Sequence, residues 1–194
     1  MMSNIKETTA ELLEIFGLTE ITNPALDIIN QNEFKYLRDL KLNFNSTLTS
    51  EYLSQKECGL LGLSVATNNQ NAVLVTFYKN YASKFGATND DLAEAVSCAS
   101  LLASNNIFYR FRHFTQKEKY TQIPARIRMQ IMMKPVTSKE FFELMSLAIS
   151  AVNGCEMCVN AHEDSLMTLD TKEERVFDAV RIASLVTSVG KIIY

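Results

Sequence analysis

The 194-residue chain has few glycines and prolines, no long uninterrupted apolar run and no excess of basic over acidic residues. Six glycines and three prolines are too few to punctuate many short strands. No stretch approaches the roughly 18 uninterrupted apolar residues that a membrane-spanning helix needs. The formal net charge of -3 gives no reason to expect nucleic acid or an anionic membrane as a partner.

The start of the sequence, MMSNIKETTAELLEIF, has neither the basic beginning nor the apolar run of a signal peptide, so we do not expect secretion. We therefore expect a cytoplasmic protein, in which permanent disulfides are rare. Of the four cysteines, Cys58 and Cys98 stand singly among apolar residues and are expected to be buried. Cys155 and Cys158 form a Cys-x-x-Cys pair, which in that compartment is more often catalytic or metal-binding than structural.

Apolar residues recur at spacings of three and four, which predicts an all-α protein with one domain over residues 1–194. No Gly/Ser-rich or Pro-rich linker divides the chain. Thr171 is the expected N-cap of the last helix. Helices are predicted at about 6–16, 25–41, 51–66, 69–85, 88–104, 106–114, 138–152 and 172–193.

An internal repeat relates residues 88–113 to residues 137–162 at an offset of 49 residues. Each copy is predicted to be an apolar helix, a break at Asn-Asn or Asn-Gly, and a second helix. Two explanations are open: a duplicated helical hairpin that kept its chemistry in one copy, or coincidence between two amphipathic hairpins. The identical positions are Thr88, Glu94, Ser97, Ala99 and His113 in the first copy, matching Thr137, Glu143, Ser146, Ala148 and His162 in the second.

The second copy contains the segment NGCEMCVNAHED, in which both thiols of the pair and one of the two histidines of the chain occur close together. If Gly154 ends a helix, Cys155 begins the next one, where the helix dipole stabilises a thiolate. Cys158 then lies on the same face as Cys155, so the two sulfurs can close a short disulfide. His162, four residues after Cys158, lies on that face too and can accept a proton from the Cys158 thiol. In an antiparallel helix pair Glu143 could come level with His162, which predicts a carboxylate–imidazole–thiol relay. His113 is expected to be a buried or partner-facing remnant without a catalytic role.

Metal and haem sites fit the motif less well than redox chemistry. Covalent haem attachment needs a histidine directly after the second cysteine, where this chain has Val159. A structural zinc site needs four ligands, and no second cluster accompanies the pair and its histidine. A thioredoxin domain would place the motif after a strand, whereas the preceding segment is predicted to be helical.

The pattern E-x11-C-x2-C-x3-H, carried by Glu143, Cys155, Cys158 and His162, resembles that of the alkylhydroperoxidase D family. That family has the carboxymuconolactone-decarboxylase-like fold. The resemblance runs from about residue 35 to the C-terminus. Residues 38–48, 105–114, 126–135 and 142–164 are also similar to family segments.

The resemblance implies an all-helical fold with two related halves, a homotrimer and no tightly bound cofactor or metal. It implies a thiol peroxidase that also passes electrons from the dihydrolipoyl group of a lipoyl-bearing protein to a peroxiredoxin, alkyl hydroperoxide reductase C. His162 would deprotonate the thiol of Cys158, and the resulting thiolate would react with the hydroperoxide. Cys155 would resolve the sulfenic acid as a redox disulfide, and Glu143 would orient His162.

Two features depart from the family pattern. Family members carry a histidine immediately before the second cysteine, where this chain has Met157. Residues 1–34 are an extension relative to shorter members, and we expect them to cover apolar surface. Two other functions are open: a decarboxylase or lactone-processing enzyme of the same superfamily, and a redox sensor whose disulfide alters its oligomer contacts.

Overall fold

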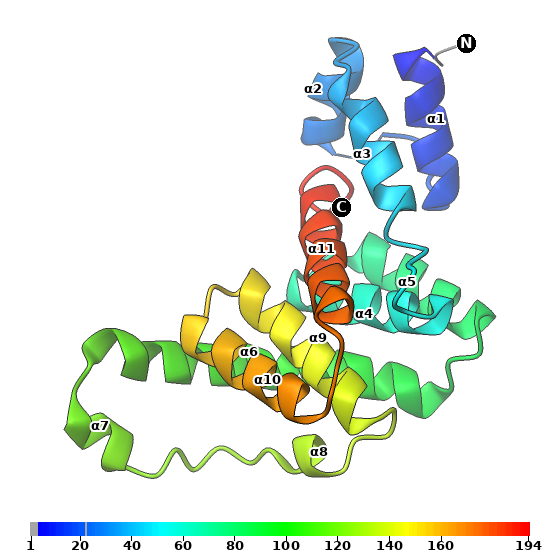
Figure 1. Ribbon diagram of the computed structural model, residues 1–194. Coiled ribbons are helices and arrows are strands. Elements are labelled where there is room, and N and C mark those ends of the chain that lie inside the picture. The colour runs from blue at the N-terminus through cyan, green and yellow to red at the C-terminus, as the bar shows by residue number, and fades with distance from the viewer. Residues whose placement is uncertain (1–3, 22) are drawn as a thin grey trace.

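The computed structural model describes residues 4–21 and 23–194, and every regular element in these two ranges is a helix (Figure 1). This confirms the all-α prediction. The helices are α1 Ile5–Ile15, α2 Pro24–Gln31, α3 Tyr36–Asn45, α4 Gln55–Asn68, α5 Ala72–Lys84, α6 Asn89–Thr115, α7 Glu118–Gln122, α8 Gln130–Met133, α9 Lys139–Val152, α10 Glu156–Thr168 and α11 Glu173–Val189.

Most helix starts are set by side chains that cap free backbone amides. Ser54 and Thr88 open α4 and α6 with capping boxes, and Ser138 accepts a hydrogen bond from the backbone of Phe141 at the start of α9. The predicted cap at Thr171 is wrong. Lys172 is the N-cap of α11 and makes no side-chain capping bond.

Two predicted boundaries also differ from the structure. The segment 25–41 is two helices, because the chain turns at Glu33, which has a positive φ of 49°. The break predicted near Asn105-Asn106 is absent, and α6 continues for 27 residues. In the second copy Gly154 has a φ of +67°, a conformation that costs little without a Cβ. The equivalent position in α6 is Asn105, which stays helical.

Helix α4 lies at the centre of the fold and contacts α5, α6, α9 and α11. Its residues from Cys58 to Ala66 are all buried, so apolar side chains surround the helix rather than forming one stripe. Gly62 allows α5 to approach closely, because a Cβ there would collide with the ring of Tyr78. The hydrophobic cluster around α4 extends from Ile5 to Ile193.

The N-terminal helices pack near the C-terminal end of α11 (Figure 1). Leu12 and Leu26 are fully buried there, and Phe16 contacts the rings of Phe44 and Phe77 in edge-to-face geometry. The first 34 residues therefore cover apolar surface, as expected for those that the structure describes. In these described residues no helix is both long and apolar enough to cross a bilayer.

The far end of α6 projects from the body of the molecule and leads into α7 (Figure 1). The chain then returns as an extended segment to α8, which contacts α9. This return path places residues 129–133 beside the helix pair that contains the Cys-x-x-Cys motif. The path therefore supplies one wall of the candidate site.

Candidate active site

The motif lies where α9 and α10 pack side by side after the turn at Asn153-Gly154 (Figure 1). Cys155 is the N-cap of α10, as the sequence predicted, and Cys158 lies in the first turn. A polar network supports the turn from α4 and α6. Asn153 donates to Asn68 and Asn106 at 3.1 and 2.9 Å, and its carbonyl accepts from Arg110 at 2.5 Å.

Glu143 and His162 meet across the two helices. His162 Nδ1 lies 2.6 Å from Glu143 Oε2, and both side chains are buried. Lys139, one turn earlier in α9, donates to Glu143 Oε1 at 2.6 Å and to the carbonyl of Met132 at 3.1 Å. The pair is thus anchored on one side to Lys139 and through it to α8.

The ionisation of Glu143 decides which nitrogen of His162 carries a proton. Burial raises the pKa of this carboxyl, but hydrogen bonds from His162 and Lys139 outweigh it and hold the pKa below its ordinary value. An ionised carboxylate only accepts, so Nδ1 of His162 must carry the hydrogen that it donates. In the neutral imidazole Nε2 is then free to accept a proton.

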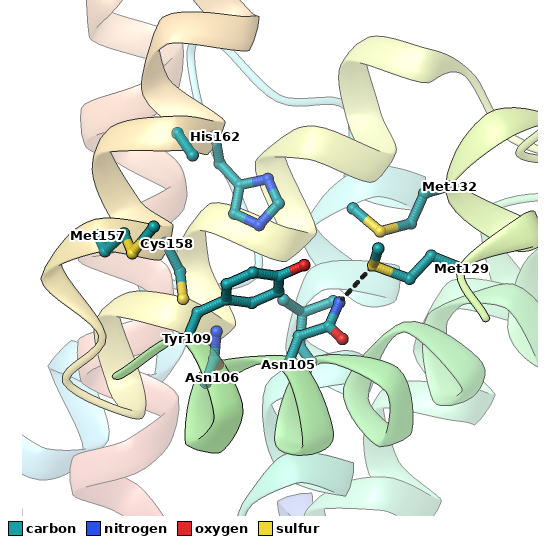
Figure 2. A pocket seen from close by; sticks show the side chains of 10 residues that line it. Asn105, Asn106, Tyr109, Met129, Met132, Met157, Cys158 and His162 are labelled. Atoms are coloured by element: carbon teal, nitrogen blue, oxygen red, sulfur yellow. Dashed lines mark hydrogen bonds between the residues drawn. The ribbon is translucent and has the colours of Figure 1, made fainter. Parts of the chain in front are cut away.

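Cys155 and Cys158 are joined by a disulfide, with their Cα atoms 5.3 Å apart. Cys155 is 1% exposed and Cys158 7% exposed. Only Cys158 of the two lines the adjoining cavity, and His162 lines the same cavity (Figure 2). Cys158 is therefore the sulfur that a small molecule in the cavity would meet first.

The cavity measures about 170 Å³ and lies between α10, α6 and the segment that leads into α8 (Figure 2). Three methionines supply thioether groups to its wall, and two asparagines and a tyrosine of α6 add polar atoms. Flexible, polarisable thioethers adapt to apolar ligands of varied shape. The lining residues are Leu102, Asn105, Asn106, Tyr109, Met129, Met132, Met157, Cys158, Ala161 and His162.

The structure brings Glu143, Cys155, Cys158 and His162 together as the spacing predicted, while several neighbours were missed. The contact of Lys139 with Glu143 could have been predicted from the sequence, because Lys139 precedes Glu143 by four residues on the same helix. Met129 and Met132 lie in a stretch without helical periodicity, so nothing in the pattern indicated their contact with the motif.

The other copy of the repeat has no such site. Glu94 accepts hydrogen bonds from the backbone amide of Val136 and from both the amide and hydroxyl of Thr137. The side chain of His113 is 39% exposed, not buried, and its Nε2 lies 3.6 Å from Glu156. Within residues 4–21 and 23–194, no three His, Cys, Asp or Glu side chains form a group able to hold a metal ion.

The two single cysteines are buried, which confirms that prediction. Burial, as the largest cause, raises the pKa of Cys58 and of Cys98 to about 12. Thiols with such pKa values remain protonated near neutral pH. They are therefore poor nucleophiles compared with a thiol beside a base.

Comparisons with known proteins agree with the motif. Residues 118–193 match the carboxymuconolactone decarboxylase family. An alkyl hydroperoxide reductase AhpD of Anaeromyxobacter dehalogenans is 39% identical over 166 residues, which are 84% of this chain and 87% of the relative. An AhpD of a Bradyrhizobium species is 38% identical over 157 residues, covering 80% of this chain and 85% of the relative.

A solved structure has the same arrangement of helices. A crystal structure from Burkholderia xenovorans, described as a gamma-carboxymuconolactone decarboxylase subunit, superposes with a TM-score of 0.67. The match covers 98% of this chain and 95% of that chain at 12% identity, so it supports the fold alone. The identity to the two reductases over most of their length shows that the chain belongs to the alkyl hydroperoxide reductase AhpD family.

Proposed function

We propose that this protein reduces alkyl hydroperoxides with the Cys155–Cys158 pair and is returned to its dithiol form by a dihydrolipoyl group. One observation carries the proposal: Cys158 shares a cavity with His162, whose Nδ1 is bound by the buried carboxylate of Glu143. This arrangement combines a nucleophile, a base and a group that orients the base. The names of the AhpD relatives support the hydroperoxide as substrate.

In the reduced protein, His162 Nε2 takes the proton from the Cys158 thiol. Glu143 keeps the imidazole in the correct tautomer and stabilises the imidazolium that forms. The first turn of α10 adds the positive end of a helix dipole near the resulting thiolate.

The thiolate attacks the terminal oxygen of the hydroperoxide. An S–O bond forms, the O–O bond breaks, and the alkoxide leaves as an alcohol after taking the proton from His162. Cys158 is then a sulfenic acid, and attack by Cys155 releases water and gives the disulfide. A dithiol reduces this disulfide by exchange and becomes a disulfide itself.

We also infer the partners that the family resemblance implies. A lipoyl-bearing protein would supply the dithiol, and a peroxiredoxin of the alkyl hydroperoxide reductase C type would receive electrons from Cys155 and Cys158. The reducing environment of the cytoplasm suits this cycle. A homotrimer is the assembly we propose, and sedimentation would test it.

Steady-state consumption of tert-butyl hydroperoxide with dihydrolipoamide as reductant tests the function. We expect sustained turnover, with one dihydrolipoamide oxidised for each hydroperoxide consumed. A redox sensor would instead consume about one equivalent and stop. A lactone-processing enzyme would instead turn over a lactone or carboxylic acid substrate, and that activity would persist after the cysteines are alkylated because the chemistry needs no disulfide.

A further inference from the structure

The amide of Asn105 is poorly satisfied although it lies in the wall of the redox cavity. Asn105 is 5% exposed, and its Oδ1 is buried without a hydrogen-bond partner. Its Nδ2 donates to the thioether sulfur of Met129 at 3.2 Å (Figure 2). A thioether is a weak acceptor, so this N–H can be transferred to a better one at little cost.

The side-chain amide of the next residue, Asn106, has hydrogen-bond partners for both its nitrogen and its oxygen. Asn106 also lines the cavity, but its Nδ2 donates to Ser150 and its Oδ1 accepts from Asn153, both at 2.9 Å. These bonds fix Asn106 to α9 and to the turn before Cys155. Buried amides are normally bonded in this way, so the N–H of Asn105, which has only a thioether as acceptor, is a donor that a ligand oxygen can take over.

We propose that Nδ2 of Asn105 donates a hydrogen bond to the inner oxygen of the hydroperoxide, the one that leaves as alkoxide, while the alkyl group packs on the thioethers. This rests on the proposed function. Asn105, Met129 and Cys158 line the same cavity, so one small hydroperoxide can reach the sulfur and the amide together.

The amide acts where charge develops during the reaction. As the Cys158 thiolate bonds the terminal oxygen, the O–O electron pair moves onto the inner oxygen, which becomes anionic until His162 returns its proton. A donor already placed in a site shielded from water stabilises that charge without reorganisation. The more basic the departing oxygen, the more the reaction depends on this donor.

If Asn105 is a catalytic donor, the effect of removing it depends on the basicity of the departing oxygen; if Asn105 only packs in the wall, it does not. Peracetic acid loses weakly basic acetate, whereas tert-butyl hydroperoxide loses strongly basic tert-butoxide. Both oxidise a thiolate by the same attack on the terminal oxygen. Iodoacetamide alkylates the thiolate without breaking an O–O bond, so it reports thiol activation alone.

The test is single-turnover oxidation of the reduced full chain carrying Asn105→Leu, a substitution of similar size that cannot donate. Asn105→Met is the second donorless variant should the first fail to fold, and Asn105→Gln restores a donor. We expect oxidation by tert-butyl hydroperoxide to slow about ten- to a hundredfold, since removing one oxyanion donor commonly costs this much or more. Oxidation by peracetic acid and alkylation should change about threefold at most, and Asn105→Gln should recover part of the rate.

Equal slowing with both oxidants, or no slowing with either, would overturn the role of Asn105. The proposed function has its own test in the unmodified protein. It is contradicted if tert-butyl hydroperoxide oxidises Cys158 there no faster than it oxidises a free thiol. In that case the role of Asn105 fails with it.

Discussion

Glu94 and Glu143 occupy equivalent places in the two copies of the repeat, yet only one of them contacts a histidine. Both are buried, at 2% and 3% exposure. Glu94 binds the chain at Val136 and Thr137, just before α9, whereas Glu143 binds His162 and Lys139. The same kind of buried carboxylate therefore holds a loop in one half and orients an imidazole in the other.

The difference arises from the path of the chain after each glutamate. Gly154 turns the second copy back on itself, so that α10 returns beside α9 and brings His162 level with Glu143. Helix α6 continues without a turn, so His113 lies 19 residues further along one helix than Glu94, roughly 28 Å away at 1.5 Å per residue. A helix break, rather than the choice of acid and histidine, separates the two halves.

Loss of a motif cysteine should reduce turnover more than any other substitution, whereas loss of a cysteine in the first copy should not. Cys158→Ser and Cys155→Ser should both abolish dihydrolipoamide-dependent hydroperoxide turnover, because each removes one sulfur of the redox pair. Cys98→Ser, in the first copy and buried, is the matched control and should retain turnover. Steady-state assays of the three variants decide the point, and full activity in either motif variant would contradict it.

The histidines give the next largest contrast. His162→Gln removes the base and should lower turnover on the order of a hundredfold, as general-base losses commonly do. The pH midpoint of thiol alkylation should also move upward. His113→Gln should leave both measurements unchanged, since its contact with Glu156 is a partly exposed pair of small energetic value. Equal losses in the two variants would show that the halves share the chemistry.

Substitution of Glu143 should lower activity, whereas substitution of Glu94 should lower stability. Glu143→Gln leaves Nδ1 of His162 without a carboxylate, and we expect about a tenfold loss of turnover, smaller than removal of the base itself. Glu94→Gln should lower the free energy of unfolding by about 2 kcal/mol, because the amide NH2 of glutamine replaces one of the two carboxylate oxygens that accept these three hydrogen bonds. Activity per folded molecule should survive in that variant, and denaturant titration alongside turnover measures both quantities.

The smallest effect concerns the turn itself. Gly154→Ala places a Cβ on a residue with a φ of +67°, which should cost about 1–2 kcal/mol of stability. Asn105→Gly in α6 should cost about 1 kcal/mol and create no hairpin, because a glycine within a helix weakens it without turning the chain. Thermal unfolding of the two variants tests this. A stability gain from Gly154→Ala would show that the left-handed turn is not required.

Local spacing was enough to predict the centre of the site. The Asn153-Gly154 stop and the four-residue steps place Cys155, Cys158 and His162 on one helix face, and helix rise brings Glu143 level with His162 once the two helices are taken to pack antiparallel. The break predicted in α6 was wrong for a tertiary reason. Asn105-Asn106 looks like a helix end, but Asn106 uses its amide to bind Ser150 and Asn153 of the neighbouring helix.

The rest of the cavity could not be predicted from pattern. Met129 and Met132 reach it from a mostly irregular return segment, whose position depends on the length of the α6 projection and on the contact between Lys139 and Met132. Such placement depends on packing across elements, which periodicity along one element does not encode. Lys139 could have been recognised from its spacing to Glu143.

We propose that the redox chemistry belongs to the second copy of the repeat alone. Its most direct test is peptide mapping by mass spectrometry after the fully reduced protein meets one equivalent of tert-butyl hydroperoxide. We expect a Cys155–Cys158 disulfide, with Cys58 and Cys98 recovered as thiols. Oxidation of Cys58 or Cys98 ahead of the pair, or no disulfide between Cys155 and Cys158, would contradict it.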